Sequence, residues 1–131
     1  LISKDEYDAL KYGTKMHKLF EQTNFLKIDE NNENKNVIEN FVKMLNITSD
    51  TLVYKEYEFI FDQENVTYHG IIDLMIEYND YIDIIDYKLN NIKDENYLKQ
   101  LNGYKNYISK ISNKEVNIYL YSIISETLEK L

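Results

Sequence analysis

Hydrophobic positions recur at helical spacing in two N-terminal segments and alternate with polar ones in the segments that follow. Residues 5–22 and 34–46 place apolar side chains three or four positions apart, which predicts two amphipathic helices. Residues 52–62 alternate apolar and polar side chains, residues 66–78 form a further strand-like segment interrupted by Gly70, and residues 81–88 are mostly apolar, with short polar turns between the three segments. This pattern predicts three strands in an antiparallel meander.

A third helix and a fourth strand are predicted after the meander. Residues 94–111 carry an apolar stripe at helical spacing, and residues 116–125 are rich in β-branched and aromatic side chains. The strand–helix–strand unit over residues 81–125 is expected to pair its strands in parallel through a right-handed crossover. The predicted fold is therefore an α/β domain over residues 1–131, with the order α-α-β-β-β-α-β and helices on both faces of a mixed sheet.

The amino-acid composition excludes several kinds of site and of cellular location. The absence of Cys excludes disulfides, thiolate metal sites and cysteine-bound iron–sulfur clusters. No apolar run approaches the roughly 20 residues of a membrane span, and no signal peptide is visible, so a cytoplasmic location away from membranes is expected. The net charge of −8 argues against nucleic acid as a partner, although residues 88–114 carry six Lys against Asp94 and Glu95, a net of +4. That segment is either a solvated helix face or a surface that contacts phosphates.

Two carboxylates and one amine are expected to meet on neighbouring strands. Asp86 and Lys88 lie two positions apart, so their side chains project from the same face of the third predicted strand. Asp73 lies on the adjacent strand, shortly after Gly70, where a bulge or a close backbone approach is expected. Carboxylates this close repel one another unless a cation lies between them, and Mg²⁺ prefers such oxygen ligands. Because residues 82–85 are mostly isoleucine, a metal site is favoured over a surface ion pair, with Lys88 acting on the attacking water or on the developing negative charge.

Five other positions are candidates for accessory roles. His17 and Glu21 share one face of the first predicted helix, so His17 is either a further metal ligand or an ordinary exposed histidine. Gln100 and Tyr104 are four positions apart on the third predicted helix and either contact the substrate or, in the case of Tyr104, belong to the core. Glu58 is a further acidic candidate on the first predicted strand, on a face that alternation alone does not fix.

Several short motifs together resemble one nuclease family. They are Tyr12-Gly13-Thr14-Lys15-Met16-His17 with Glu21 and Phe25, Lys55-Glu56-Tyr57-Glu58-Phe59, Gly70-Ile71-Ile72-Asp73-Leu74, Ile85-Asp86-Tyr87-Lys88, Tyr97 with Gln100-Leu101 and Tyr104, and Tyr119-Leu120-Tyr121-Ser122. In this order the motifs resemble the RecB-type nuclease domain of the PD-(D/E)XK superfamily, as found at the C-terminus of AddA-type helicase–nucleases. The resemblance covers nearly the whole chain and implies a restriction-endonuclease-like sheet.

The resemblance implies a reaction and a set of roles. The reaction is Mg²⁺-dependent hydrolysis of DNA phosphodiester bonds, with Mn²⁺ as a substitute, by an exonuclease that is ATP-dependent in the full complex and acts in recombinational repair of double-strand breaks. The implied metal ligands are His17, Asp73, Asp86 and the backbone carbonyl of Tyr87. Lys88 is implied as the catalytic lysine, and the implied accessory or DNA-contacting residues are Glu21, Glu58, Gln100 and Tyr104.

The same resemblance implies partners and leaves alternatives open. The expected partners are single-stranded DNA, helicase domains of the same chain and an AddB-like subunit, and the start at Leu1 fits a C-terminal fragment of a larger helicase–nuclease. No Gly-x-x-x-x-Gly-Lys-Ser/Thr loop is present, so no ATP site of that type is expected here, and Leu89 stands where the family usually has Thr. The alternatives are a non-catalytic module that binds DNA or another protein chain, and a stand-alone phage-type exonuclease. Retention of Asp73, Asp86 and Lys88 together favours an active nuclease.

Overall fold

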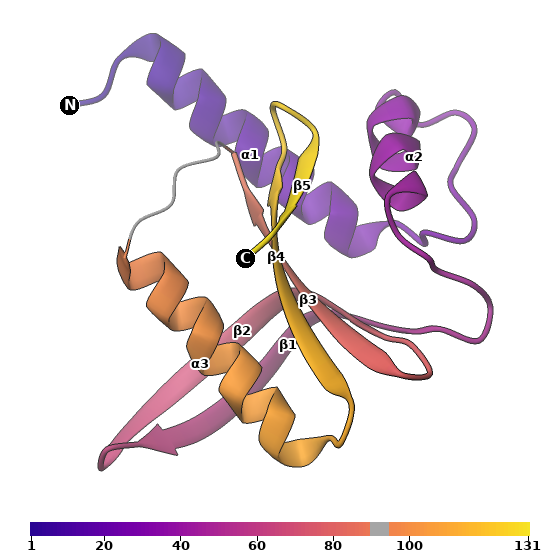
Figure 1. The fold of residues 1–131 in the computed structure, drawn as a ribbon. Helices are drawn as coiled ribbons and strands as arrows, with labels where there is room; N and C mark the ends of the chain where they lie inside the picture. Colours follow the sequence, from indigo (N-terminus) through magenta and orange to yellow (C-terminus); the bar gives the residue numbers. More distant parts are fainter. Residues whose placement is uncertain (90–94) are drawn as a thin grey trace.

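A five-stranded mixed sheet forms the centre of the molecule (Figure 1). The computed structural model describes residues 1–89 and 95–131. The elements are α1 (Lys4–Gln22), α2 (Lys35–Lys43), β1 (Leu52–Gln63), β2 (Val66–Glu77), β3 (Tyr81–Lys88), α3 (Glu95–Ile111), β4 (Glu115–Ser122) and β5 (Thr127–Lys130). The strand order is β1-β2-β3-β4-β5, with β3 and β4 parallel and the other neighbours antiparallel.

Helices cover both faces of this sheet, as predicted. On one face, side chains of α3 such as Leu101 and Ile108 pack with Ile84 of β3 and Ile118 of β4. On the other face, α1 and α2 form a second core with β2, β3 and β4, whose largest fully buried members include Phe20, Phe41, Leu74, Ile85 and Tyr121. The sheet is thus a middle layer whose two sides are both largely apolar.

The first helix is anchored at its C-terminal half. The side chain of Ser3 caps α1 by accepting a hydrogen bond from the Glu6 amide at 3.1 Å. Of the apolar side chains that predicted this helix, Met16 and Phe20 are fully buried, whereas Tyr7 and Leu10 are exposed. The buried half of α1 therefore fixes the side chains around residue 17 against the sheet.

The parallel pairing predicted for the strand–helix–strand unit is confirmed. β3 runs over the predicted residues, and β3 pairs in parallel with β4 after the intervening α3. The predicted start of the third helix at Asp94, and Lys93 of the basic segment, lie outside the described residues. The second helix is shorter than the predicted 34–46, because it ends at Lys43.

The predicted final strand is wrong in its length. Instead of one strand over residues 116–125, β4 ends at Ser122 and the chain turns back into the short strand β5, which pairs antiparallel with β4. The turn is made by Glu126 at a φ of 52° and is supported by a 2.9 Å hydrogen bond between the Ser125 and Thr127 hydroxyls. Residues 123–126 contain no Gly, Pro or Asn, so Ser125 is the one weak turn signal in that segment of the sequence.

In the described part of the chain, none of the helices combines the length and the apolar character that crossing a bilayer requires.

Candidate active site

The predicted site residues line one cavity between the sheet, α1 and α3. Its volume is about 360 Å³. The lining residues are His17, His69, Ile71, Asp73, Asp86, Tyr87, Lys88, Gln100 and Tyr104. The structure thus brings most of the predicted residues to one place, from two helices and two strands.

A local irregularity in β1 and β2 places acidic side chains toward α1. Ile72 packs in the core beneath α3 and Leu74 in the core beneath α1 and α2, so the alternation of β2 shifts at Asp73. Directly across on β1, Glu56 has a φ of 50° and lies between the paired residues Lys55 and Tyr57. A left-handed backbone costs a non-glycine residue about 1–2 kcal/mol, which the surrounding sheet must offset. The result is that Glu56 and Asp73 both reach the histidine on α1.

His17 lies between these two carboxylates. Its Nε2 is 2.8 Å from Asp73 Oδ1, and its Nδ1 is 3.3 Å from Glu56 Oε1. The hydrogen bond with Asp73 is the main reason that the pKa of His17 is raised above its ordinary value. The second oxygen of Asp73 accepts a hydrogen bond from the Tyr87 amide at 2.8 Å, which holds the carboxylate in place between β2 and β3.

Glu56 belongs to this group although its sequence position did not single it out. Ligand atoms of His17, Glu56 and Asp73 all lie within 4.8 Å of one another. Glu56 Oε1 is buried and, among the described residues, has no hydrogen-bond donor in proper geometry, and burial raises the pKa of this carboxyl. An unsatisfied carboxylate oxygen beside a second carboxylate and an imidazole fits a divalent cation, so these residues suit the metal that the resemblance implies.

The glutamate chosen from the sequence lies elsewhere. Glu58 is exposed and its Oε2 is 3.3 Å from His69 Nε2, at the outer rim of the cavity. Glu56 and Glu58 are two positions apart in the Lys55-Glu56-Tyr57-Glu58 motif, and only Glu58 was singled out from the sequence, on a face that alternation did not fix. The left-handed backbone that turns Glu56 toward His17 carries no sequence signal.

Asp86 and Lys88 form a second group of charged side chains, and both contact Tyr97. The Tyr97 hydroxyl donates a 2.6 Å hydrogen bond to Asp86 Oδ2, and Lys88 Nζ lies 3.6 Å from the same oxygen. The Lys88 ammonium also sits 4.3 Å from the centre of the Tyr97 ring, which is a cation–π contact. Among the residues that the structure describes, Asp86 is outside the three-residue cluster of His17, but it lies so close to Asp73 that, besides its burial, the charge of Asp73 raises its pKa.

Asp86 is poorly solvated in this position. Burial, followed by the charge of Asp73, raises the pKa of Asp86 to about 7, although the Tyr97 hydrogen bond and Lys88 act in the opposite direction. A carboxyl with these neighbours ionises readily only when a positive charge comes close, which is the setting expected of a metal-binding carboxylate.

A pH dependence of stability follows from this pKa. The folded state holds a proton on Asp86 up to about pH 7, whereas the unfolded state loses it near pH 3.9, so the contribution of Asp86 to stability falls as pH rises through that window. In urea unfolding with EDTA present, the stability of the parent relative to Asp86→Asn is expected to fall by up to about 1.4 kcal/mol per pH unit. Parallel pH profiles for the two proteins would contradict the assignment.

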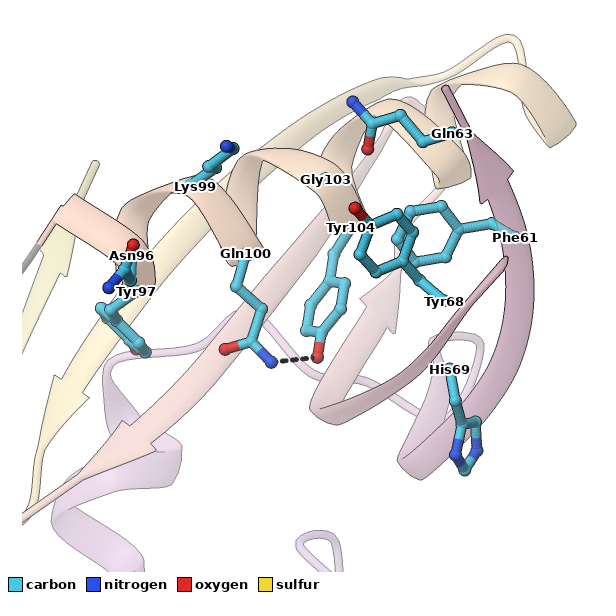
Figure 2. A pocket seen from close by; sticks show the side chains of 10 residues that line it. All are labelled: Phe61, Gln63, Tyr68, His69, Asn96, Tyr97, Lys99, Gln100, Gly103 and Tyr104. Atoms are coloured by element: carbon cyan, nitrogen blue, oxygen red, sulfur yellow. Dashed lines mark hydrogen bonds between the residues drawn. The ribbon is translucent and has the colours of Figure 1, made fainter. Parts of the chain in front are cut away.

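Gln100 and Tyr104 form the wall of the cavity on α3. Gln100 Nε2 donates a 2.8 Å hydrogen bond to the Tyr104 hydroxyl, which also accepts one from the Ile71 amide at 3.5 Å (Figure 2). The ring of Tyr104 is buried in the core beneath α3, so this residue is both a core residue and a lining residue. Glu21 is exposed and lines a neighbouring hollow that also includes His17 and Lys88.

Leu89, which departs from the family pattern, has a packing role. Its Cδ1 lies 3.3 Å from the position that a Cβ on Gly13 would take. The glycine of α1 therefore lets the helix approach the end of β3 closely, next to Lys88.

Comparisons with known proteins point to helicase–nucleases. No family model matches the chain. An ATP-dependent helicase/nuclease of the AddA type from Clostridium acetobutylicum is 36% identical over 81 residues, covering 54% of this chain and 6% of that protein. A protein of the same name from Clostridium beijerinckii is 38% identical over 82 residues, covering 56% of this chain and 7% of that protein. The chain thus contains a region related to AddA-type helicase/nucleases, and it matches only a small part of their length.

Proposed function

We propose that this chain is a metal-dependent DNA nuclease domain of the PD-(D/E)XK type that hydrolyses phosphodiester bonds in single-stranded DNA. The observation that carries the proposal is the meeting of His17, Asp73, Asp86 and Lys88 in one cavity. The relationship to AddA-type helicase/nucleases supports the same conclusion.

The proposal gives different residues of the site different roles. His17, Glu56 and Asp73, together with Asp86 and the backbone carbonyl of Tyr87, hold Mg²⁺ or Mn²⁺. When bound, such an ion polarises a phosphate oxygen and lowers the pKa of a bound water. Lys88, held by Asp86 and by the ring of Tyr97, contacts the attacking water or the negative charge that develops on the phosphate.

The wider setting that we propose rests on the resemblance to helicase–nucleases, and the related region in two such proteins supports it. In a full-length helicase–nuclease, helicase domains of the same chain and an AddB-like subunit deliver the strand, so that digestion depends on ATP that is bound outside this domain. The process served is recombinational repair of double-strand breaks in the cytoplasm.

Metal binding is expected to stabilise the folded chain. A ligand that binds only the folded state, at a free concentration one hundred times its dissociation constant, adds about 2.7 kcal/mol to the free energy of unfolding. A titration with Mg²⁺ or Mn²⁺ is therefore expected to raise the melting temperature by several degrees. Asp73→Asn should remove most of this rise, because it removes a negative charge between His17 and Asp86.

The matched control for this titration is Asp8→Asn. Asp8 is an exposed carboxylate on the solvated half of α1, so this variant should respond to the metal as the parent does. A melting temperature that does not respond to either metal in the parent, or a response that persists in Asp73→Asn, would overturn the metal site.

A further inference from the structure

A second and larger cavity adjoins the candidate active site. It measures about 580 Å³ and lies between α3 and the end of the β1–β2 hairpin (Figure 2). His69, Gln100 and Tyr104 line both cavities, so a chain molecule bound at the active site can continue from one into the other.

Stacked aromatic rings form one side of this second cavity. The rings of Phe61 and Tyr68 lie 5.2 Å apart with an angle of 20° between their planes. Tyr68 is the outer ring, with 45% of its surface exposed. Phe61 is backed in turn by Phe59, which stacks on Tyr107 of α3 at 4.5 Å. The exposed ring therefore rests on a fixed aromatic base and offers a flat surface for another ring.

The polar groups around these rings suit a nucleotide. Gln63, Asn96 and Gln100 each bring an amide, which can donate and accept hydrogen bonds as the edge of a base requires. Lys99 is the charged group of the lining, and among the described residues no Asp or Glu lines this cavity, although the chain as a whole carries a net charge of −8. A smaller hollow that continues past Phe61 and Gln63 is lined by one charge of each sign, from Lys110 and Asp62.

We propose that this cavity holds an unpaired nucleobase, stacked on Tyr68, of the same DNA strand whose phosphate lies in the active site. The proposal rests on the proposed nuclease function and deepens it by naming the subsite beside the reaction centre. Stacking needs a base whose face is free, so the cavity selects single-stranded over duplex DNA. A flat ring with amide and ammonium neighbours is the combination that single-strand binding surfaces use.

Binding in a background that does not cut tests this proposal independently of catalysis. The Lys88→Ala chain is mixed with a single-stranded oligodeoxynucleotide in Mg²⁺ at low ionic strength, with 2-aminopurine moved one position at a time. Stacking on Tyr68 is expected to quench the fluorescence at one position. Adding Tyr68→Ala is expected to abolish that quenching and to weaken binding about tenfold, because stacking on an aromatic side chain contributes on the order of 1–3 kcal/mol per base.

Three controls isolate the ring. Tyr68→Phe keeps the ring and should bind and quench as the Tyr68 protein does. Tyr7→Ala removes a tyrosine of similar exposure, 55%, from the distant end of α1 and should change nothing. A blunt duplex of the same sequence should bind with equal affinity whether or not the chain carries the Tyr68→Ala substitution.

The results separate this proposal from the proposed function. Equal single-strand binding by Tyr68→Ala and Tyr68→Phe, or quenching at no position, would overturn the base subsite. Absence of cleavage by the parent chain in Mg²⁺ and Mn²⁺ would instead overturn the nuclease function. Melting temperatures of all variants verify that each remains folded.

Discussion

Asp86→Ala and Lys88→Ala are each expected to reduce the cleavage of single-stranded DNA by at least about 100- to 1,000-fold, the usual effect of removing one charge-stabilising group from an active site. Asp86 lies between Asp73 and the pair Lys88 and Tyr97, so its loss removes a carboxylate that is proposed to hold the metal and also removes the ion pair of the lysine. Lys88→Ala removes the ammonium that faces the cavity. The measurement is the rate of release of labelled nucleotides in Mg²⁺ and in Mn²⁺.

These two variants are expected to fold normally. Asp86 is a carboxyl that burial disfavours in its ionised form, and Lys88 is partly exposed, so neither replacement removes apolar packing from the core. Asp80→Ala and Lys43→Ala, which change residues outside the cavity, are matched controls and should cut at the parent rate. If Asp86→Ala and Lys88→Ala cut as fast as the controls, the site assignment is wrong. A parent chain that binds DNA and does not cut it would favour the non-catalytic module.

Gly70→Ala is expected to destabilise the protein by about 1–3 kcal/mol, the usual cost of overpacking a core. A Cβ at this position would lie 2.5 Å from Cζ of Phe59. The Phe59 ring has little room to withdraw, because it stacks on Tyr107 at 4.5 Å and meets Tyr104 edge-on at 5.3 Å. The close backbone approach expected at Gly70 is therefore found in the structure, where the Phe59 ring lies across the backbone and leaves no room for a Cβ. Urea unfolding at neutral pH measures the effect.

Gly103→Ala is the matched control, and its effect should have the opposite sign. The nearest atom to a Cβ at this position of α3 is 3.8 Å away, an ordinary contact, and alanine in a helix interior is about 0.5–1 kcal/mol more favourable than glycine. A double-mutant cycle between Gly70→Ala and Phe59→Leu should show strong coupling, because the smaller side chain relieves the clash. Stability of Gly70→Ala equal to that of the parent would contradict this packing.

The third strand was predicted to the residue, and the reason is its burial. Residues 81–88 are flanked by apolar partners on both faces, so few other registers would bury the same side chains. The last hairpin was missed because residues 123–126 turn without Gly, Pro or Asn, through Glu126 in a left-handed conformation. Local pattern alone does not reveal a turn that tertiary pairing with β4 maintains.

In the candidate site, too, one part could be predicted from the sequence and another part depends on the three-dimensional structure. Spacing predicted that Asp86 and Lys88 share a face and that Asp73 lies close, and the structure places them around one cavity. The choice between Glu56 and Glu58 depended on a left-handed residue and on a matching shift of alternation at Asp73, which are three-dimensional features of two paired strands. The functional roles of all these residues stay predictions that the variants above test.

The position of His17 on α1 has one more consequence. This imidazole comes from a helix, whereas Glu56, Asp73 and Asp86 come from three strands of the sheet. The proposed cation would join the helix to the sheet, so metal binding would require α1 to be packed on the sheet through Met16 and Phe20. Undocking of the first helix would therefore remove the imidazole ligand and open the core on that face at the same time.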